Sequence, residues 1–64
     1  MRHPEIEVQL TGEDGNAFSV LGRVTKALRR AGVSKEERDL FMVEATAGNY
    51  DDLLNTCMDW VDCA

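Results

Sequence analysis

The sequence predicts a mainly α-helical domain, with one N-terminal β-strand at about residues 5–10 followed by a compact bundle of three helices. We expect the helices at about residues 17–31, 35–47 and 50–62. Three observations support this prediction. Apolar residues alternate with polar ones at the start of the chain, they recur at three- and four-residue steps further on, and capping residues or glycines separate the helical segments. The connections are short, so we expect one domain over residues 1–64.

The strand prediction depends on the segment EIEVQL, in which Ile6, Val8 and Leu10 alternate with polar residues. The backbone of a strand needs hydrogen-bond partners, and the sequence shows no second strand. Three partners stay open: a short extended piece near either terminus, the same strand of a second copy, and a partner protein. We favour the second copy, because oligomerisation commonly stabilises domains of this size. The sequence therefore predicts a homodimer paired through the N-terminal strand.

The first helix follows the segment TGEDGNAF, where Asn16 is well placed as its N-cap. Gly32 comes after two arginines and is typical of the residue that ends a helix. Between these two positions the apolar residues have helical spacing. They are Phe18, Val20, Leu21, Val24, Leu28 and Ala31.

The second and third helices each begin with a recognisable cap. Ser34 and Glu37 have the spacing of a capping box, in which each side chain bonds the backbone amide of the other residue. Gly48 ends the second helix, and Asn49 caps the third, which carries two aspartates in its first turn. The expected apolar residues of the second helix are Leu40, Phe41, Val43, Ala45 and Ala47, and those of the third are Tyr50, Leu53, Leu54, Cys57 and Val61.

The composition limits the classes of function. A net charge of −5 disfavours general nucleic-acid binding, which depends on neutralising phosphates. Two cysteines and one histidine are too few for a Cys/His zinc site. No apolar run is long enough to cross a membrane and no signal peptide is evident, so we expect no membrane partner and a cytoplasmic location.

No group of residues in the sequence has the pattern of a catalytic site. Cys57 and Cys63 lie six positions apart, which on one helix means about 9 Å of rise and opposing directions, too far for a disulfide. We expect Cys57 to be a small buried apolar residue. His3 lies in a terminal stretch that we expect to be loose, with no partners for a catalytic triad. The sequence therefore predicts no enzyme, no catalytic residues, no metal and no cofactor.

An anion site is the first alternative. TGEDGNAF joins a strand to a helix N-terminus, where backbone amides favour negative charge. The amides of Gly15 and Asn16 with Arg23 would then hold a nucleotide signal, and the protein would sequester it. Glu13 and Asp14 repel a phosphate, however, so we favour a turn followed by an N-cap.

A weaker alternative is a nucleic-acid accessory factor. Residues 23–30 carry four basic side chains and no acid. Three of the four share one face of the predicted helix, namely Arg23, Lys26 and Arg30. We favour a solvated helix face, with the last basic residues stabilised by the helix dipole.

Protein binding is the class that we favour. Tryptophan and tyrosine often anchor interfaces, and the chain has more large apolar groups than one side of so small a core can hold. Packing of the tryptophan at the edge of the bundle is an equally good interpretation. The predicted interface residues are Ile6, Val8 and Leu10 of the strand, and Asp51, Asp52, Asp59 and Trp60 of the third helix.

Two resemblances add to these expectations. From Val24 to Val61 the stretches LRRAGVSKEE and EATAGNYDDLLNTCMDWV resemble a ubiquitin-associated (UBA-like) three-helix domain. UBA domains bind ubiquitin through a hydrophobic loop after the first helix, which here is Ala31-Gly32-Val33. This resemblance implies a three-helix fold and a role in protein binding.

The whole sequence also resembles a family of small phage and prophage proteins. The residues that carry this resemblance are GEDGNAF and EATAGNY, which match G-x-x-GNAF and EAT-x-G-x-Y. The resemblance implies a phage-type accessory protein that binds a host protein, such as a defence or regulatory factor. Its partners would then be a host protein and a second copy of the chain.

Overall fold

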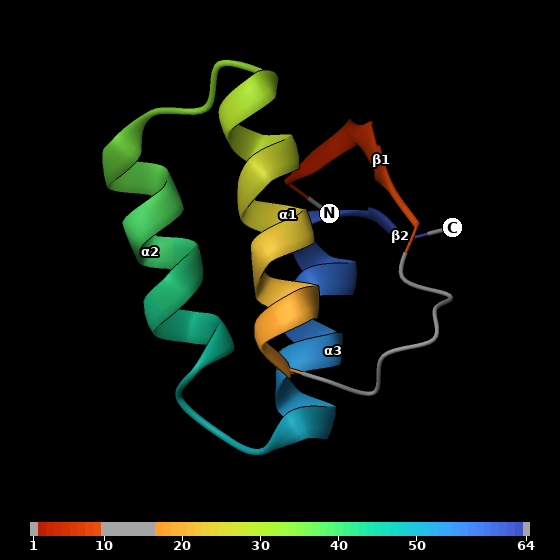
Figure 1. Cartoon of the computed structure of the whole chain (residues 1–64), viewed down its shortest axis with the longest axis vertical. Helices are drawn as coiled ribbons and strands as arrows, with labels where there is room; N and C mark the ends of the chain where they lie inside the picture. Colours follow the sequence, from red (N-terminus) through yellow and green to blue (C-terminus); the bar gives the residue numbers. More distant parts are fainter. Residues whose placement is uncertain (1, 10–16, 64) are drawn as a thin grey trace.

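Five elements follow one another in the computed structural model, which describes residues 2–9 and 17–63 of the chain. They are β1 (His3–Val8), α1 (Ala17–Arg30), α2 (Lys35–Ala45), α3 (Tyr50–Trp60) and β2 (Val61–Cys63) (Figure 1). The predicted fold class and the starts of the three helices are confirmed. Leu10, Gly15 and Asn16 lie outside the described residues.

The chain itself supplies a partner for β1. From the sequence we expected no second strand and a third helix that continues to about residue 62. Instead α3 ends at Trp60, and β2 pairs with β1 in parallel. Val61 has extended backbone angles, although its amide still donates to the carbonyl of Cys57. The strand was missed because Val61 keeps the i, i+4 spacing from Cys57, so the apolar pattern of a helix runs on into a strand.

The pairing of β1 and β2 is irregular. The partners are His3 with Val61, Glu7 with Asp62, and Val8 with Cys63. Three β1 residues therefore lie between two pairs that are adjacent on β2. Such a bulge bends the strand, and Figure 1 shows β1 as a sharply bent ribbon beside α1.

The core lies where the three helices meet the inner face of the sheet. All five elements contribute to it. Its residues are Ile6, Val8, Val20, Leu21, Val24, Leu28, Phe41, Ala45, Leu53, Cys57, Trp60 and Val61. The expected burial of Cys57 is confirmed, whereas Ile6 and Val8, which were predicted as interface residues, lie in the core of the chain itself.

Some residues expected in the core are exposed instead. Phe18, in the first turn of α1, is 83% exposed, and Leu40 and Val43 of α2 are also exposed. Only Phe41 and Ala45 of α2 are buried. These two lie one helical turn apart, so α2 covers the bundle with a single narrow stripe rather than with a broad apolar face.

The helix ends follow local chemistry. Gly32 has φ +85°, a conformation that favours glycine, and it turns the chain out of α1. The Oγ of Ser34 accepts a hydrogen bond from the amide of Glu37 at 3.2 Å. The prediction that the Glu37 carboxylate bonds the Ser34 amide in return is wrong, because that carboxylate lies near Arg2 and His3.

At the start of α3 both halves of a capping box are present. The amide of Asp52 donates to Asn49 Oδ1 at 2.9 Å, and the amide of Asn49 donates to Asp52 Oδ2 at 3.1 Å. A side chain at Gly48 would collide with the Asp52 carboxylate, so the glycine makes room for this cap. Among the described residues, no helix is both long enough and apolar enough to span a membrane.

Candidate functional site

Trp60 is a core residue. Its side chain is 1% exposed and packs edge-to-face on Phe41, with 5.4 Å between the ring centroids. The indole Nε1–H donates to Glu44 Oε1 at 3.0 Å, so the polar atom of the ring has a partner. Of the two interpretations left open by the sequence, the structure shows packing within the bundle. Trp60 therefore offers no exposed surface to a partner.

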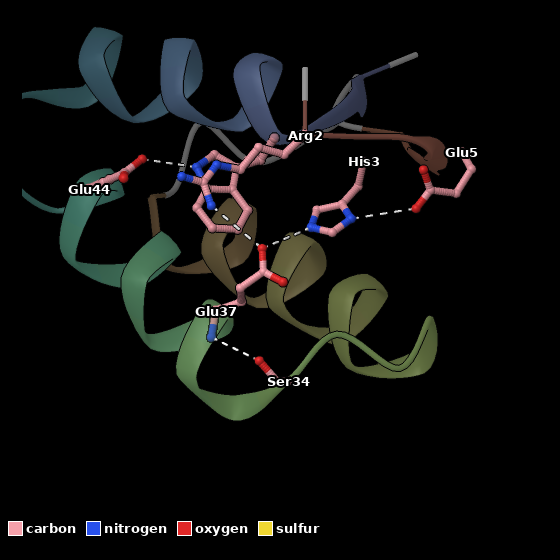
Figure 2. A network of polar contacts seen from close by, with 7 residues as sticks. Arg2, His3, Glu5, Ser34, Glu37 and Glu44 are labelled. Atoms are coloured by element: carbon pink, nitrogen blue, oxygen red, sulfur yellow. Dashed lines mark hydrogen bonds and ion pairs between the residues drawn. The ribbon is translucent and has the colours of Figure 1, made fainter.

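The N-terminal residues cover this tryptophan. The Arg2 guanidinium lies 4.5 Å from the centre of the Trp60 ring, and the Arg2 amide donates to the carbonyl of Asp59 at 2.8 Å. Arg2 Nη1 is also 3.5 Å from Glu37 Oε1. Figure 2 shows the ion pairs of Arg2 and His3 with Glu37, which join these residues to α2. Cation–π contacts of this kind contribute about 0.5 to 1 kcal/mol at exposed sites.

His3 was expected to lie in a loose terminal stretch, but the structure shows it in contact with neighbouring side chains. Its ring nitrogens lie between two carboxylates, with Nδ1 3.5 Å from Glu5 Oε2 and Nε2 3.5 Å from Glu37 Oε1 (Figure 2). Both separations are too long for good hydrogen bonds. They are ion pairs when the imidazole is protonated.

The predicted interface residues do not form one surface. Ile6 and Val8 are each 6% exposed and face the core. Asp51 and Asp52 lie in the first turn of α3, whereas Asp59 lies near its other end, a rise of about 12 Å away. All three aspartates are exposed, but Asp52 is engaged as a cap.

A groove lies between β1 and α1. Its volume is about 550 Å³, within the usual range of binding pockets. Five consecutive residues from Glu5 to Gln9 form one wall, and α1 forms the other. This second wall consists of Arg23, Lys26, Ala27 and Arg30 of α1 and of Ala31, which follows the helix. No described residue of β2 lines the groove.

The two walls carry opposite charges. Arg23, Lys26 and Arg30 project from α1 at i, i+3 and i+7, and β1 contributes Glu5 and Glu7. The Nη1 of Arg23 donates to the carbonyl of Gln9 at 3.2 Å. Within the described part of the chain, Glu7, Lys26 and Arg30 take part in no ion pair.

Sequence reasoning found one half of this groove. The basic face of α1 was identified as a nucleic-acid alternative, but the position of the β1 edge beside it was not foreseen. Of the three residues predicted to hold a nucleotide signal, Arg23 is bonded to Gln9. Gly15 and Asn16 lie outside the described residues.

Both cysteines are free thiols, as expected. Burial raises the pKa of Cys57 from 9.0 to about 11, with a smaller contribution from the nearby Cys63. Burial also raises the pKa of Cys63, followed by the effect of the Asp62 charge. Because the thiolate is the nucleophile, both side chains are poorly reactive at neutral pH. Among the described residues, no three His, Cys, Asp or Glu side chains gather closely enough to hold a metal ion.

Comparisons with protein-family models, with curated proteins and with solved structures found no match to this chain. The resemblances to UBA-like domains and to phage proteins therefore stay predictions.

Proposed function

We propose that this protein is a non-enzymatic, phage-type accessory protein that acts by binding a host protein. The observation that carries the proposal is the charged groove beside the strand β1. The expectation that the partner belongs to a host comes from the resemblance to phage and prophage proteins.

The edge of β1 supports this proposal. A strand has two edges, and the two-stranded sheet uses one edge of β1 for β2. Because residues 5–9 all line the groove and no described β2 residue does, the second edge of β1 borders the groove. An unpaired strand edge is a template for an added chain.

The charges beside this edge support it further. Lys26 and Arg30 are exposed on a regular helix, so their positions are fixed by a rigid element. Side chains of like charge that lack partners favour an oppositely charged ligand. Such charge complementarity raises both the specificity of binding and the association rate. Ile6, Val8 and Ala27 add apolar atoms to the lining of the groove.

A comparison of two charge-reversal variants tests the proposal. The groove variant is Lys26→Glu/Arg30→Glu, and the matched control is Arg29→Glu/Lys35→Glu. Each pair changes two exposed basic residues and the net charge by the same amount, and Arg29 and Arg30 share the last turn of α1. Neither Arg29 nor Lys35 lines the groove.

Native mass spectrometry of the tagged proteins, gently purified from a lysate of the host, provides the readout. We expect the wild type and the control variant to carry the same host polypeptide in fixed stoichiometry and the groove variant to lack it. Equal capture by all three proteins would contradict the groove as the docking site. A mass increase on the scale of a nucleotide, in place of a polypeptide, would favour the sequestering alternative.

A further inference from the structure

We propose that the groove binds an extended segment of the partner, and that this segment adds to β1 as a new strand. Within the segment, acidic residues alternate with basic or neutral ones. This inference rests on the proposed function and names the chemistry of the partner at the same site.

The shape of the groove favours an extended segment. Its β1 wall is a run of consecutive residues rather than every second one, so the backbone edge faces the groove along with the side chains. Apart from the β2 pairing, the Arg2 amide bond and the bond from Arg23 Nη1 to the Gln9 carbonyl, the described backbone of residues 2–9 makes no further hydrogen bond. A strand laid along this edge would satisfy those amides and carbonyls, whereas a helix in the groove would leave them unpaired.

The charges on the α1 wall determine one row of partner side chains. Arg23, Lys26 and Arg30 span about 10 Å along the helix axis. Every second residue of a strand points the same way, at a repeat of about 7 Å. Two acidic residues at positions i and i+2 of the segment would therefore lie within the span of the three basic side chains.

The charges on β1 determine the other row. Glu5 and Glu7 are both exposed on the outer face of the strand. Residues of the partner that lie beside them on this face are cross-strand neighbours, and like charges at such positions are destabilising. The alternate positions of the segment are therefore basic or neutral, which gives the proposed alternation.

A second copy of β1 fits this pattern less well. In a symmetric antiparallel pair the outer faces coincide, and the glutamates Glu5 and Glu7 of one copy would face those of the other. Its apolar residues Ile6 and Val8 are already buried against its own core. Nucleic acid also fits less well, because a phosphate backbone would lie against the same two glutamates.

A selection from a random peptide library tests the proposal. Displayed peptides are selected on the wild-type chain and on the Arg29→Glu/Lys35→Glu control, with the Lys26→Glu/Arg30→Glu groove variant as the counter-selection target. We expect enriched peptides to carry Asp or Glu at every second position, with basic or neutral residues between them and no proline in the alternating part. Proline is excluded because it lacks the amide that pairs with a strand.

The enriched peptides are then measured in solution. We expect a selected peptide to bind the groove variant at least about tenfold more weakly than the control, which corresponds to about 1.4 kcal/mol. Amide shifts in two-dimensional NMR should fall on residues 5–9 and on the groove face of α1. The same peptide with a central proline should lose binding.

Several results of the peptide experiments would overturn this inference. They are enrichment without charge alternation, shifts confined to another face, and the failure of any peptide to enrich over the counter-selection. An oligothymidylate probe tests for nucleic acid. If the wild type and the control bind this probe tightly and in a salt-sensitive way, and only the groove variant does not, the inference is overturned in favour of nucleic acid. The proposed function would survive the first outcome, provided that capture of the host protein still depended on Lys26 and Arg30.

Discussion

Replacement of Trp60 with phenylalanine tests how the two ends of the chain are held to the bundle. The smaller ring loses the Nε1–H bond to Glu44, which at a partly exposed site contributes about 1 kcal/mol. The cavity left in the core costs about another 1 kcal/mol. A weaker contact with the Arg2 guanidinium costs about 0.5 kcal/mol. We therefore expect Trp60→Phe to lower the free energy of unfolding by about 2 to 3 kcal/mol.

This loss is large for a chain of 64 residues, whose total stability is about 3 to 10 kcal/mol. The assay is urea denaturation followed by far-ultraviolet circular dichroism, because the variant lacks the only tryptophan of the chain. The expected fall in melting temperature is on the order of 10 °C.

A double-mutant cycle with Glu44→Ala isolates the hydrogen bond. If Trp60 and Glu44 interact as described, the double variant is less destabilised than the sum of the single variants by about 1 kcal/mol. The reasoning fails if Trp60→Phe changes stability by less than about 0.5 kcal/mol, or if the two substitutions are additive.

Three further predictions concern single positions. Gly32→Ala should destabilise the fold by about 1 to 2 kcal/mol, because the φ of +85° is unfavourable for alanine even though its side chain would meet no neighbouring atom. Gly22→Ala, in mid-helix with open space around it, should stabilise the fold by about 0.5 to 1 kcal/mol. Changes of the same sign in the free energy of unfolding of the two variants would contradict the argument. Asn49→Ala removes the capping box and should cost about 1 to 2 kcal/mol in the same assay, whereas an unchanged midpoint would show that the cap is dispensable. Because the folded chain keeps the Cys57 thiol protonated up to about pH 11 while the unfolded chain ionises near 9.0, stability is full below pH 9 and falls towards pH 11, by on the order of 1 to 2 kcal/mol. The advantage of the wild type over Cys57→Ala should shrink across that interval, and a constant difference would refute the raised pKa.

The helix starts were predictable because caps act locally. Ser34 and Asn49 bond amides only three residues away, and Gly32 adopts its conformation within one turn. β2 was not predictable in this way. It is three residues long, and Val61 is extended because β1 lies beside it, which is a tertiary effect.

The candidate site was predictable in composition but not in arrangement. The spacing of Lys26 and Arg30 showed that they share a helix face. Their position across a groove from Glu7 depends on how β1 packs on α1. The contacts of Arg2 with Trp60 left no signal either, because they join residues almost a chain length apart.

The parallel pairing of His3 with Val61 has a consequence for folding kinetics. It closes a loop of about 60 residues, for which the length-dependent entropy cost is about 3 to 4 kcal/mol in a disordered chain. Helices made of local contacts form quickly, so the sheet should assemble late, after the bundle has shortened that loop. During synthesis β1 emerges before the three helices, and β2 emerges only after them. The edge of β1 that faces β2 in the native state thus stays without its partner until α3 has been made.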